Sequence, residues 1–511
     1  MISRINSAVL NGLDVVATEV EVGFSRGIPG IVIVGLPDNA VKESRERLKL
    51  AISQANFDYP QATKIVINLS PADVRKEGSA LDLPMAVGII KNRYRMESPA
   101  FADLLFYGEL TLSSDLNPVK GVLNISLFAR EQGFRGIVIP FENRVEAQFV
   151  KGIEVYALKN LTQVIQLIEN PASFIPCHAE ITKDPGGVVC ENDFSEIKGQ
   201  YMAKRVMEIA AAGFHNVLMI GSPGSGKSMI SKALPSILPD MSDDEILETS
   251  LIYSAAGLLG EKGGLVCRRP FRSPHHTISD VGISGGGKYP MPGEISLAHN
   301  GVLFLDEIPY FKKSALEVLR QPLEDGKITV SRSLTSSTFP ARFMLVAAMN
   351  PSQDAVGLGE AGGVAASHSQ KHRYYAKLSK PLLDRIDLQI EVKKVKLEEI
   401  TSPLLAESSA DIRERVVRAR DLQLLRFKNL KKKIFANGQM RNAEIRKFCP
   451  LDENGGQLLR LAVDKFDLSA RGYFKVLKVA RTIADLEGVE TIASRHVQEA
   501  LQYRSLDLAR F

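Results

Sequence analysis

The chain has 511 residues, of which 45% are hydrophobic, and a formal net charge of +5. This length is too great for one hydrophobic core, so we expect two or three domains and exclude a single small module. No run of 18 or more apolar residues occurs, which argues against a membrane-spanning helix and a membrane partner. Four separated cysteines without a CxxC pair argue against a disulfide framework or a zinc site.

The first part of the chain, residues 1–168, alternates strand patterns such as IVIVGLP and KIVINLS with helical patterns such as NAVKESRERLKLAISQA. Such alternation predicts an α/β or α+β domain. The N-terminus has neither an apolar signal core nor a cleavage site, so we expect a cytoplasmic protein. Residues 169–192 are rich in Pro and Gly and lack periodicity, and we interpret them as a linker.

A serine and a lysine in this first part raise the question of peptide hydrolysis. The stretch KEGSALDLPMAVGII carries Ser79, and GELTLSSDLNPVKGVL, which follows it, carries Lys120. Serine and lysine form a hydrolytic pair when they lie within hydrogen-bond reach. A serine before an apolar helical run also suits a helix N-cap, and this is the role that we expect for Ser79.

A phosphate-binding loop follows in the second part. The octapeptide GSPGSGKS fits the pattern GxxxxGK[ST], with an apolar strand before it and a helix after it. Glycines let backbone N–H groups wrap the phosphates, Lys227 would reach the β- and γ-phosphates, and Ser228 would ligate Mg²⁺. We therefore predict a site for ATP and Mg²⁺ formed by Gly221, Ser222, Pro223, Gly224, Ser225, Gly226, Lys227 and Ser228.

Two later strands end in polar residues that complement this loop. The apolar run GVLFL ends in Asp306, which suits Mg²⁺ coordination, and Glu307, which suits polarisation of the attacking water. Such a pair can also be an ordinary solvated turn. The next strand, RFMLVAAMN, ends at Asn350, whose amide could orient the water or sense the γ-phosphate. The order of loop, acidic pair and asparagine fits an AAA+ ATPase.

The last part of the chain, residues 396–511, has a helical pattern with short polar breaks. It holds 22 Lys and Arg against 16 Asp and Glu, and within 413–447 the counts are 12 against 3. This basic stretch is either a solvated helix face or a surface that contacts the phosphate backbone of nucleic acid. Under the second interpretation the residues that contact DNA include Lys431, Lys432 and Lys433.

Several long motifs resemble the magnesium-chelatase-like AAA+ family known as ComM or YifB. The resemblance covers nearly the whole chain and implies an α/β multidomain protein, with an AAA+ core over 193–395 and a helical C-terminal lid over 396–511. The motifs are DFSEIKGQ (193–200), the phosphate-binding loop, FRSPHHTIS (271–279), GGGKYPMPGEISLAHNGVLFLDE (285–307), PARFMLVAAMNP (340–351), KPLLDRIDLQIEV (380–392) and LSARGYFKVLKVARTIADLEG (468–488).

The same resemblance implies roles for single residues. Arg385 resembles the arginine finger, which acts across a subunit interface, Arg471 resembles the sensor 2 arginine, and Gln200 lies in the motif at the entry of the nucleotide site. A finger supplied by a neighbour implies a ring, which in this family is expected to be a hexamer. Either arginine could instead form a surface ion pair.

Two insertions are expected to point toward the pore of such a ring. One is the segment 271–300 with Lys288, and the other is the hairpin 324–341 with Arg332 near its tip. In related rings such hairpins touch nucleic acid, whereas the alternative is that both residues are plain loop charges.

The first domain, residues 1–168, resembles the proteolytic domain of Lon protease. In that alignment the nucleophile falls on Ala80 rather than Ser79, and the catalytic lysine falls on Leu123 rather than Lys120. The resemblance therefore implies a domain without peptidase activity, retained as a platform. The stretch after Asn350 lacks the cysteines of many family members, and we expect a flexible loop there rather than a zinc site at His368 and His372.

Two classes of function remain open from the sequence. The family resemblance implies a ring-shaped DNA helicase or translocase that promotes branch migration of recombination intermediates, in natural transformation or DNA repair. The alternative is a protein-remodelling or chelatase-type AAA+ ATPase. The Lon-like first domain is compatible with this alternative, because it resembles a domain that acts on proteins.

Overall fold

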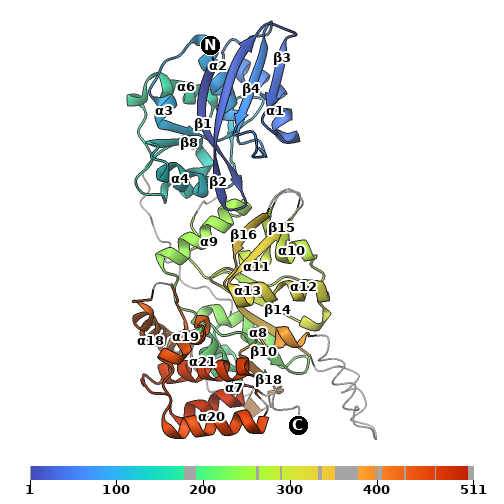
Figure 1. The fold of residues 1–511 in the computed structure, drawn as a ribbon, viewed down its shortest axis with the longest axis vertical. Helices are drawn as coiled ribbons and strands as arrows, with labels where there is room; N and C mark the ends of the chain where they lie inside the picture. The colour runs from blue at the N-terminus through green and yellow to red at the C-terminus, as the bar shows by residue number, and fades with distance from the viewer. Residues whose placement is uncertain are drawn as a thin grey trace.

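The computed structural model describes residues 2–177, 192–259, 264–287, 290–331, 336–350, 378–395, 398–399, 406–430, 433–466 and 468–504. The described residues form an N-terminal part, a central part and a C-terminal helical part along the long axis of the molecule (Figure 1). Lys288, Arg332, Lys431, Lys432, His368 and His372 lie outside the described residues.

The N-terminal part is built on a four-stranded sheet with the order β1-β2-β4-β3. Strands β1 (Ile2–Asn11) and β2 (Asp14–Ser25) form an antiparallel hairpin, while β3 (Gly30–Val34) runs parallel to β4 (Lys64–Ser70). Alternate residues of β4 are buried, as expected when only one face of a sheet is covered. The core beneath this sheet includes helices α1 (Asn39–Gln54) and α2 (Asp82–Tyr94).

A second, smaller sheet completes the N-terminal part. Its strands β5 (Leu104–Phe106), β8 (Gly136–Pro140) and β9 (Glu154–Leu158) are parallel, and α4 (Val122–Glu131) packs against them. The prediction of a mixed α/β arrangement for this part of the chain agrees with the structure.

The expectation that Ser79 caps helix α2 is wrong. The helix begins at Asp82 after Leu81, which provides no side-chain cap. The chain turns at Gly78, where φ is +76°, and the Ser79 hydroxyl hydrogen-bonds the Glu109 carboxylate instead. Lys120 lies elsewhere, with its side chain alongside Gly257 of the central part. The serine and the lysine therefore have separate partners.

The central part contains a five-stranded parallel sheet with the order β11-β14-β17-β10-β18. Its strands are short apolar runs, and the three in the middle are fully buried, as is usual when helices cover both faces. The strands are β10 (Val217–Ile220), β11 (Phe271–Arg272), β14 (Val302–Leu305), β17 (Met344–Met349) and β18 (Leu388–Glu391). Because all five run the same way, their carboxyl ends lie at one edge of the sheet.

Two hairpins and two long helices extend this core. Strands β12 (Gly285–Gly286) and β13 (Met291–Pro292) form one hairpin, and β15 (Lys327–Ser331) and β16 (Ser336–Pro340) form the other. The second is the hairpin predicted over 324–341. Helix α7 (Tyr201–Gly213) precedes β10, and α9 (Asp243–Ala256) rises toward the N-terminal part (Figure 1).

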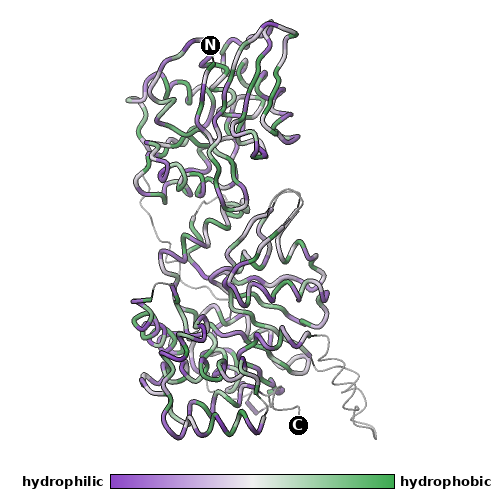
Figure 2. The backbone as a smooth tube through the Cα atoms, in the orientation of Figure 1, coloured by the Kyte–Doolittle hydropathy of each residue, from purple (hydrophilic) through white to green (hydrophobic). Residues whose placement is uncertain are grey.

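The C-terminal part is helical, as predicted. In Figure 2 hydrophilic and hydrophobic segments alternate along these helices, as expected of amphipathic helices that pack on a core. The helices are α18 (Ser409–Phe427), α19 (Asn442–Phe448), α20 (Glu453–Phe466), α21 (Ala470–Leu486) and α22 (Ser494–Gln502), and they share one hydrophobic core with α7 and the central sheet. Within the described ranges, no helix has the length and hydropathy required of a membrane span.

The N-terminal part rests on the end of α9. The backbone N–H of Gly121 donates to the carbonyl oxygen of Ser254 at 2.9 Å, and the Ser254 hydroxyl donates to Glu146 at 2.7 Å. Burial raises the pKa of Glu146, although its hydrogen bonds act in the opposite direction. In addition, Leu13 in the β1–β2 turn packs against the hydrophobic core around β15 and β16.

Candidate nucleotide site

The candidate site lies where three neighbouring strands of the central sheet end. Strand β10 leads into the loop that begins at Gly221, β14 leads to Asp306, and β17 leads to Asn350. These strands are adjacent in the order β14-β17-β10, so segments far apart in sequence meet at one edge. Ligands of open parallel sheets bind at this edge.

Lys227, the first residue of α8 (Lys227–Ala233), connects the loop with the end of β17. Its ammonium group donates to the carbonyl oxygens of Gly221 at 2.8 Å and Ser222 at 3.0 Å, and to Oδ1 of Asn350 at 3.0 Å. Burial lowers the pKa of Lys227, and the charges of Asp306 and Glu307 oppose this shift. The predicted phosphate-binding lysine and the predicted sensor asparagine are therefore in direct contact.

The loop needs glycine at three positions. A Cβ atom at Gly221 would lie 2.3 Å from the carbonyl oxygen of Val392, which is too close for any side chain. Gly224 and Gly226 have φ angles of +76° and +92°, in the left-handed region that favours glycine. This backbone exposes N–H groups at the start of α8, which is the arrangement that holds phosphate oxygens.

Ser228 and Asp306 provide oxygen atoms for a metal ion. Oγ of Ser228 donates to Oδ2 of Asp306 at 2.7 Å. A hydroxyl and a carboxylate are hard oxygen ligands of the kind that Mg²⁺ takes together with phosphate oxygens. The donor set in this part of the chain thus fits a nucleotide with its Mg²⁺ ion.

The two carboxylates that follow β14 have different surroundings. Asp306 is partly buried and accepts the backbone N–H of Glu307 at 2.9 Å, in addition to the Ser228 hydroxyl. Glu307 is exposed, and its φ of +51° is unusual for a residue other than glycine. Backbone strain of this kind is concentrated at functional sites. The arrangement leaves the Glu307 side chain free to face a water molecule.

Gln200 lies at the other side of the loop, as the family motif predicts. Its side-chain amide donates to the carbonyl oxygens of Ser225 at 2.9 Å and Lys393 at 2.6 Å. It therefore joins the phosphate-binding loop to the segment that follows β18.

Arg385 and Arg471 lie together, away from this loop. Arg385 precedes β18, so it lies at the amino-terminal edge of the parallel sheet, opposite the loop. One oxygen of Glu324 pairs with Arg385, and its other oxygen lies 3.6 Å from Nη2 of Arg471. Both arginines therefore lie beside one carboxylate, apart from the phosphate-binding loop.

A buried cluster that the sequence analysis missed fixes the backbone next to Arg385. Lys475 of α21 donates to the carbonyl oxygen of Ile386 at 2.9 Å and lies 3.4 Å from the Asp387 carboxylate. His215 lies 3.7 Å from the same carboxylate. Burial lowers the pKa of Lys475 to about 8 despite this partner. The triplet Arg385-Ile386-Asp387 is thus tied to the helix that carries Arg471.

Part of the positive charge in the stretch 413–447 is paired or buried within the molecule. Lys433, one of the three lysines predicted to contact DNA, pairs with Asp244. Arg420 is buried against backbone carbonyl oxygens, and burial lowers its pKa to about 9. Other described members pair with carboxylates: Arg413 with Asp240, Arg415 with Glu208 and Glu407, Arg418 with Glu414, and Arg426 with Asp485. These contacts favour a structural role for the positive charge of α18.

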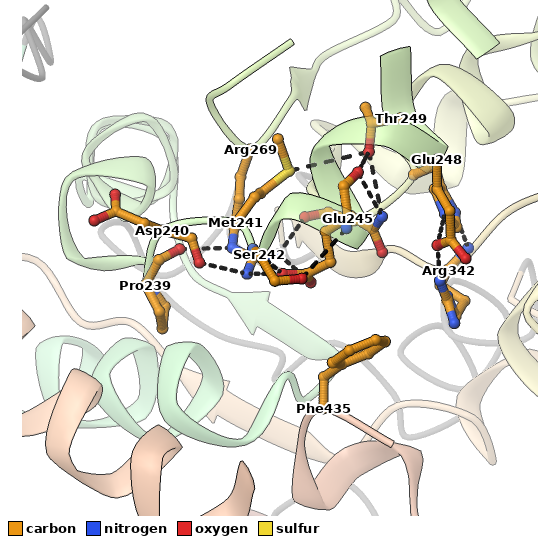
Figure 3. Close-up of polar contacts among 12 residues, drawn as sticks. Pro239, Asp240, Met241, Ser242, Glu245, Glu248, Thr249, Arg269, Arg342 and Phe435 are labelled. Atoms are coloured by element: carbon orange, nitrogen blue, oxygen red, sulfur yellow. Dashed lines mark hydrogen bonds and ion pairs between the residues drawn. The ribbon is translucent and has the colours of Figure 1, made fainter. Parts of the chain in front are cut away.

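A second polar network, also missed from the sequence, holds helix α9 (Figure 3). The Arg269 guanidinium forms two bonds to Glu245, at 2.9 and 3.0 Å, and donates to the carbonyl oxygen of Pro239 at 2.7 Å. Arg342 pairs with Glu248, one turn along α9, and lies over the ring of Phe435 at 5.5 Å. The capping pattern SDDE at the start of α9 predicts a helix there, but it does not predict these distant arginine partners.

Comparison with known proteins gives matches along the chain. Family models described as magnesium chelatase subunit ChlI match residues 193–400, with an N-terminal model over 20–143 and a C-terminal model over 406–504. Competence protein ComM of Haemophilus influenzae is 40% identical over 503 residues, covering 97% of this chain and 96% of the relative. YifB of Escherichia coli is 38% identical over 510 residues, covering 99% and 97%. A magnesium-chelatase 67 kDa subunit of Chlorobaculum parvum is 27% identical over 168 residues, or 32% of this chain and 24% of the relative.

Proposed function

Because the chain belongs to the ComM/YifB family of magnesium-chelatase-like AAA+ proteins, we propose that it is an ATP hydrolase that assembles into a ring and moves along or remodels DNA. The observation that carries this proposal is the meeting of Lys227, Ser228, Asp306 and Asn350 at three adjacent strand ends. The proposed domain limits are 1–168, 193–395 and 396–511.

The residues of the site have distinct roles in the proposed hydrolysis. The loop N–H groups and Lys227 hold the β- and γ-phosphates, while Ser228 and Asp306 hold Mg²⁺, which neutralises phosphate charge when bound. Glu307 orients the attacking water and accepts its proton as the water oxygen bonds the γ-phosphorus. The bond between that phosphorus and the β–γ bridging oxygen breaks, and ADP and phosphate are released. Asn350, already bonded to Lys227, senses the γ-phosphate and aligns the water.

The position of the two arginines supports the proposed ring assembly. Arg385 lies at the sheet edge opposite its own loop, and Glu324 brings Arg471 to the same place. An arginine so placed serves the nucleotide of a neighbouring subunit, and a head-to-tail contact of this kind closes into a ring. We take the ring to be a hexamer, in line with the family.

DNA is the proposed partner, with branch migration of recombination intermediates as the reaction. A relative that matches 97% of this chain is named as a competence protein, and the hairpin β15–β16 is one of the two insertions that the family resemblance assigns to a pore. The proposed DNA contacts are Lys288, Arg332, Lys431, Lys432 and Lys433. The first two carry more of the proposal, because Lys433 pairs with Asp244 and the arginines of α18 are paired or buried.

The alternative is a chelatase-type or protein-remodelling ATPase. The internal pairing of the basic stretch and the match to a magnesium-chelatase subunit favour it. An ATPase assay with single-stranded, duplex and four-way-junction DNA separates the two functions. Stimulation by DNA supports the motor, whereas stimulation only by a protein substrate supports the alternative.

We also propose that the N-terminal domain is a Lon-like platform without peptidase activity. The separate partners of Ser79 and Lys120 support this, since a dyad requires the two side chains within hydrogen-bond reach.

A further inference from the structure

One carboxylate holds both arginines of the proposed subunit interface. Glu324 is the fifth residue of the short helix α13 (Arg320–Asp325). Its Oε2 pairs with Nη2 of Arg385, and its Oε1 lies 3.6 Å from Nη2 of Arg471. The side chains of Glu324 and Arg471 are 53% and 60% exposed, whereas that of Arg385 is 13% exposed. Glu324 therefore reaches the arginines from the solvent side, where an incoming anion would arrive.

Contacts within the protein hold most of Arg385 in place and leave one guanidinium nitrogen, Nη2, directed at Glu324. Its Nη1 donates to the carbonyl oxygen of Pro381 at 2.7 Å, and its own carbonyl oxygen accepts from Asn216 at 3.1 Å. Its Nε is buried without a hydrogen-bond partner among the described residues. Only Nη2, the atom paired with Glu324, can exchange one anionic partner for another without disturbing the backbone.

The space around this carboxylate is open and rich in cations. Two open cavities, of about 680 and 1120 Å³, are both lined by Glu324, Asp325 and Arg385, and Arg471 lines the larger. The larger cavity has more cations than carboxylates. Its further cations are Lys327, Arg342, Lys433, Arg441, Lys475 and Lys478, and its carboxylates besides Glu324 and Asp325 are Glu248, Asp384 and Asp387. A cavity of this charge suits the phosphates of a nucleotide presented by a neighbouring subunit.

We propose that Glu324 is a positioning residue that occupies Arg385 and Arg471 in the free subunit and competes for them with the γ-phosphate of a neighbour's nucleotide. Carboxylate and phosphate oxygens are alternative partners of the same guanidinium group. If Glu324 remained in place, its negative charge would repel the incoming phosphates, so it must withdraw before the arginines act. This inference rests on the proposed ring ATPase.

The fold links this withdrawal to the hairpin β15–β16. Glu324 stands two residues before Gly326, which has a φ of +69° and begins the hairpin. The backbone N–H of Ala341 donates to the carbonyl oxygen of Gly326 at 2.9 Å, which closes the hairpin at its base. A load on the hairpin therefore pulls on the segment that carries Glu324. A change in the position of the hairpin would thereby alter the contacts of Glu324 with Arg385 and Arg471.

The test compares Glu324→Gln with Glu453→Gln, the same change at an exposed glutamate of α20 that lines neither cavity. We expect Glu324→Gln to lower the KM for ATP and raise basal turnover, each by about threefold to tenfold, the effect of one nearby like charge. It should also lose most of the stimulation by four-way-junction DNA, while Glu453→Gln retains wild-type values. A fall in kcat with an unchanged KM, or equal effects of both variants, would overturn the inference.

A second measurement does not depend on turnover. In a Glu307→Gln background, which holds ATP without hydrolysing it, sedimentation with Mg²⁺ and ATP should show Glu324→Gln rings at lower protein concentration than the parent. Equal or weaker assembly contradicts the role of Glu324. Failure of the proposed function is recognised separately, because wild-type protein would then neither hydrolyse ATP nor assemble with it.

Discussion

Oγ of Ser228 donates a hydrogen bond to Oδ2 of Asp306 at 2.7 Å, although 78 positions separate the two residues in sequence. The first lies at the start of α8 and the second at the end of β14, so the contact depends on the parallel order of the central sheet. It places a hydroxyl and a carboxylate where one metal ion would bind both, beside the exposed Glu307.

Glu307→Gln is predicted to reduce ATP hydrolysis by at least about 10²-fold while nucleotide binding is retained, because the amide can hold water but cannot accept its proton. The measurement pairs phosphate release with the affinity for a fluorescent ATP analogue. Ser228→Ala serves as the contrast, since the loss of a metal ligand should raise the Mg²⁺ concentration needed for half-maximal hydrolysis. Wild-type turnover in Glu307→Gln would refute its role.

Arg385→Ala is predicted to lose hydrolysis but to bind ATP at its own loop, because the arginine lies at the opposite edge of the sheet. Mixing it with Lys227→Ala should restore part of the activity, since mixed rings contain interfaces with one intact loop and one intact finger. Rings shown to be mixed that recover no activity would count against action across the interface.

Ser79→Ala is predicted to retain full ATPase activity, and neither it nor the wild type should cleave an unfolded protein such as casein. The Ser79 hydroxyl bonds Glu109, and Lys120 lies beside Gly257. Cleavage that requires ATP and disappears in Ser79→Ala would overturn the platform role of the N-terminal domain.

Stability is predicted to fall as the pH drops below about 6.5. Burial lowers the pKa of His215 from its ordinary value of 6.5. Below pH 6.5 this histidine therefore binds a proton in the unfolded chain but not in the folded protein, which lowers the free energy of unfolding. Urea unfolding at several pH values should show this slope, and His215→Gln should flatten it. The matched control is His275→Gln, at an exposed histidine, which should retain the wild-type slope. An unchanged slope in His215→Gln would contradict this assignment.

The sequence predicts which residues of the candidate nucleotide site come together, because they lie in motifs whose spacing is tied to strand ends. Lys227, Ser228, Asp306 and Asn350 each follow or adjoin a short apolar run, and parallel strands bring such ends together. The contact of Glu324 with Arg385 and Arg471 joins segments far apart in sequence without a motif, so no local pattern predicts it.

Local signals also fail where a tertiary partner competes with them. Ser79 has the sequence of an N-cap, but the left-handed turn at Gly78 directs its hydroxyl to Glu109. The basic run of α18 has the composition of a DNA-binding surface, but Arg415 and Arg426 pair with carboxylates on other helices, Glu208 and Asp485. Composition records the charge of a segment and not the position of its counter-charges.

The central claim, an ATP-driven motor on branched DNA, is tested most directly by strand exchange on a synthetic four-way junction. Wild-type protein with ATP and Mg²⁺ should convert the junction into duplex products, and Glu307→Gln should bind the junction without converting it. Binding should weaken steeply with salt, because phosphate contacts release counterions. If the wild type neither binds nor converts the junction while a protein substrate stimulates its ATPase activity, the protein is a protein-remodelling ATPase and the DNA motor is refuted.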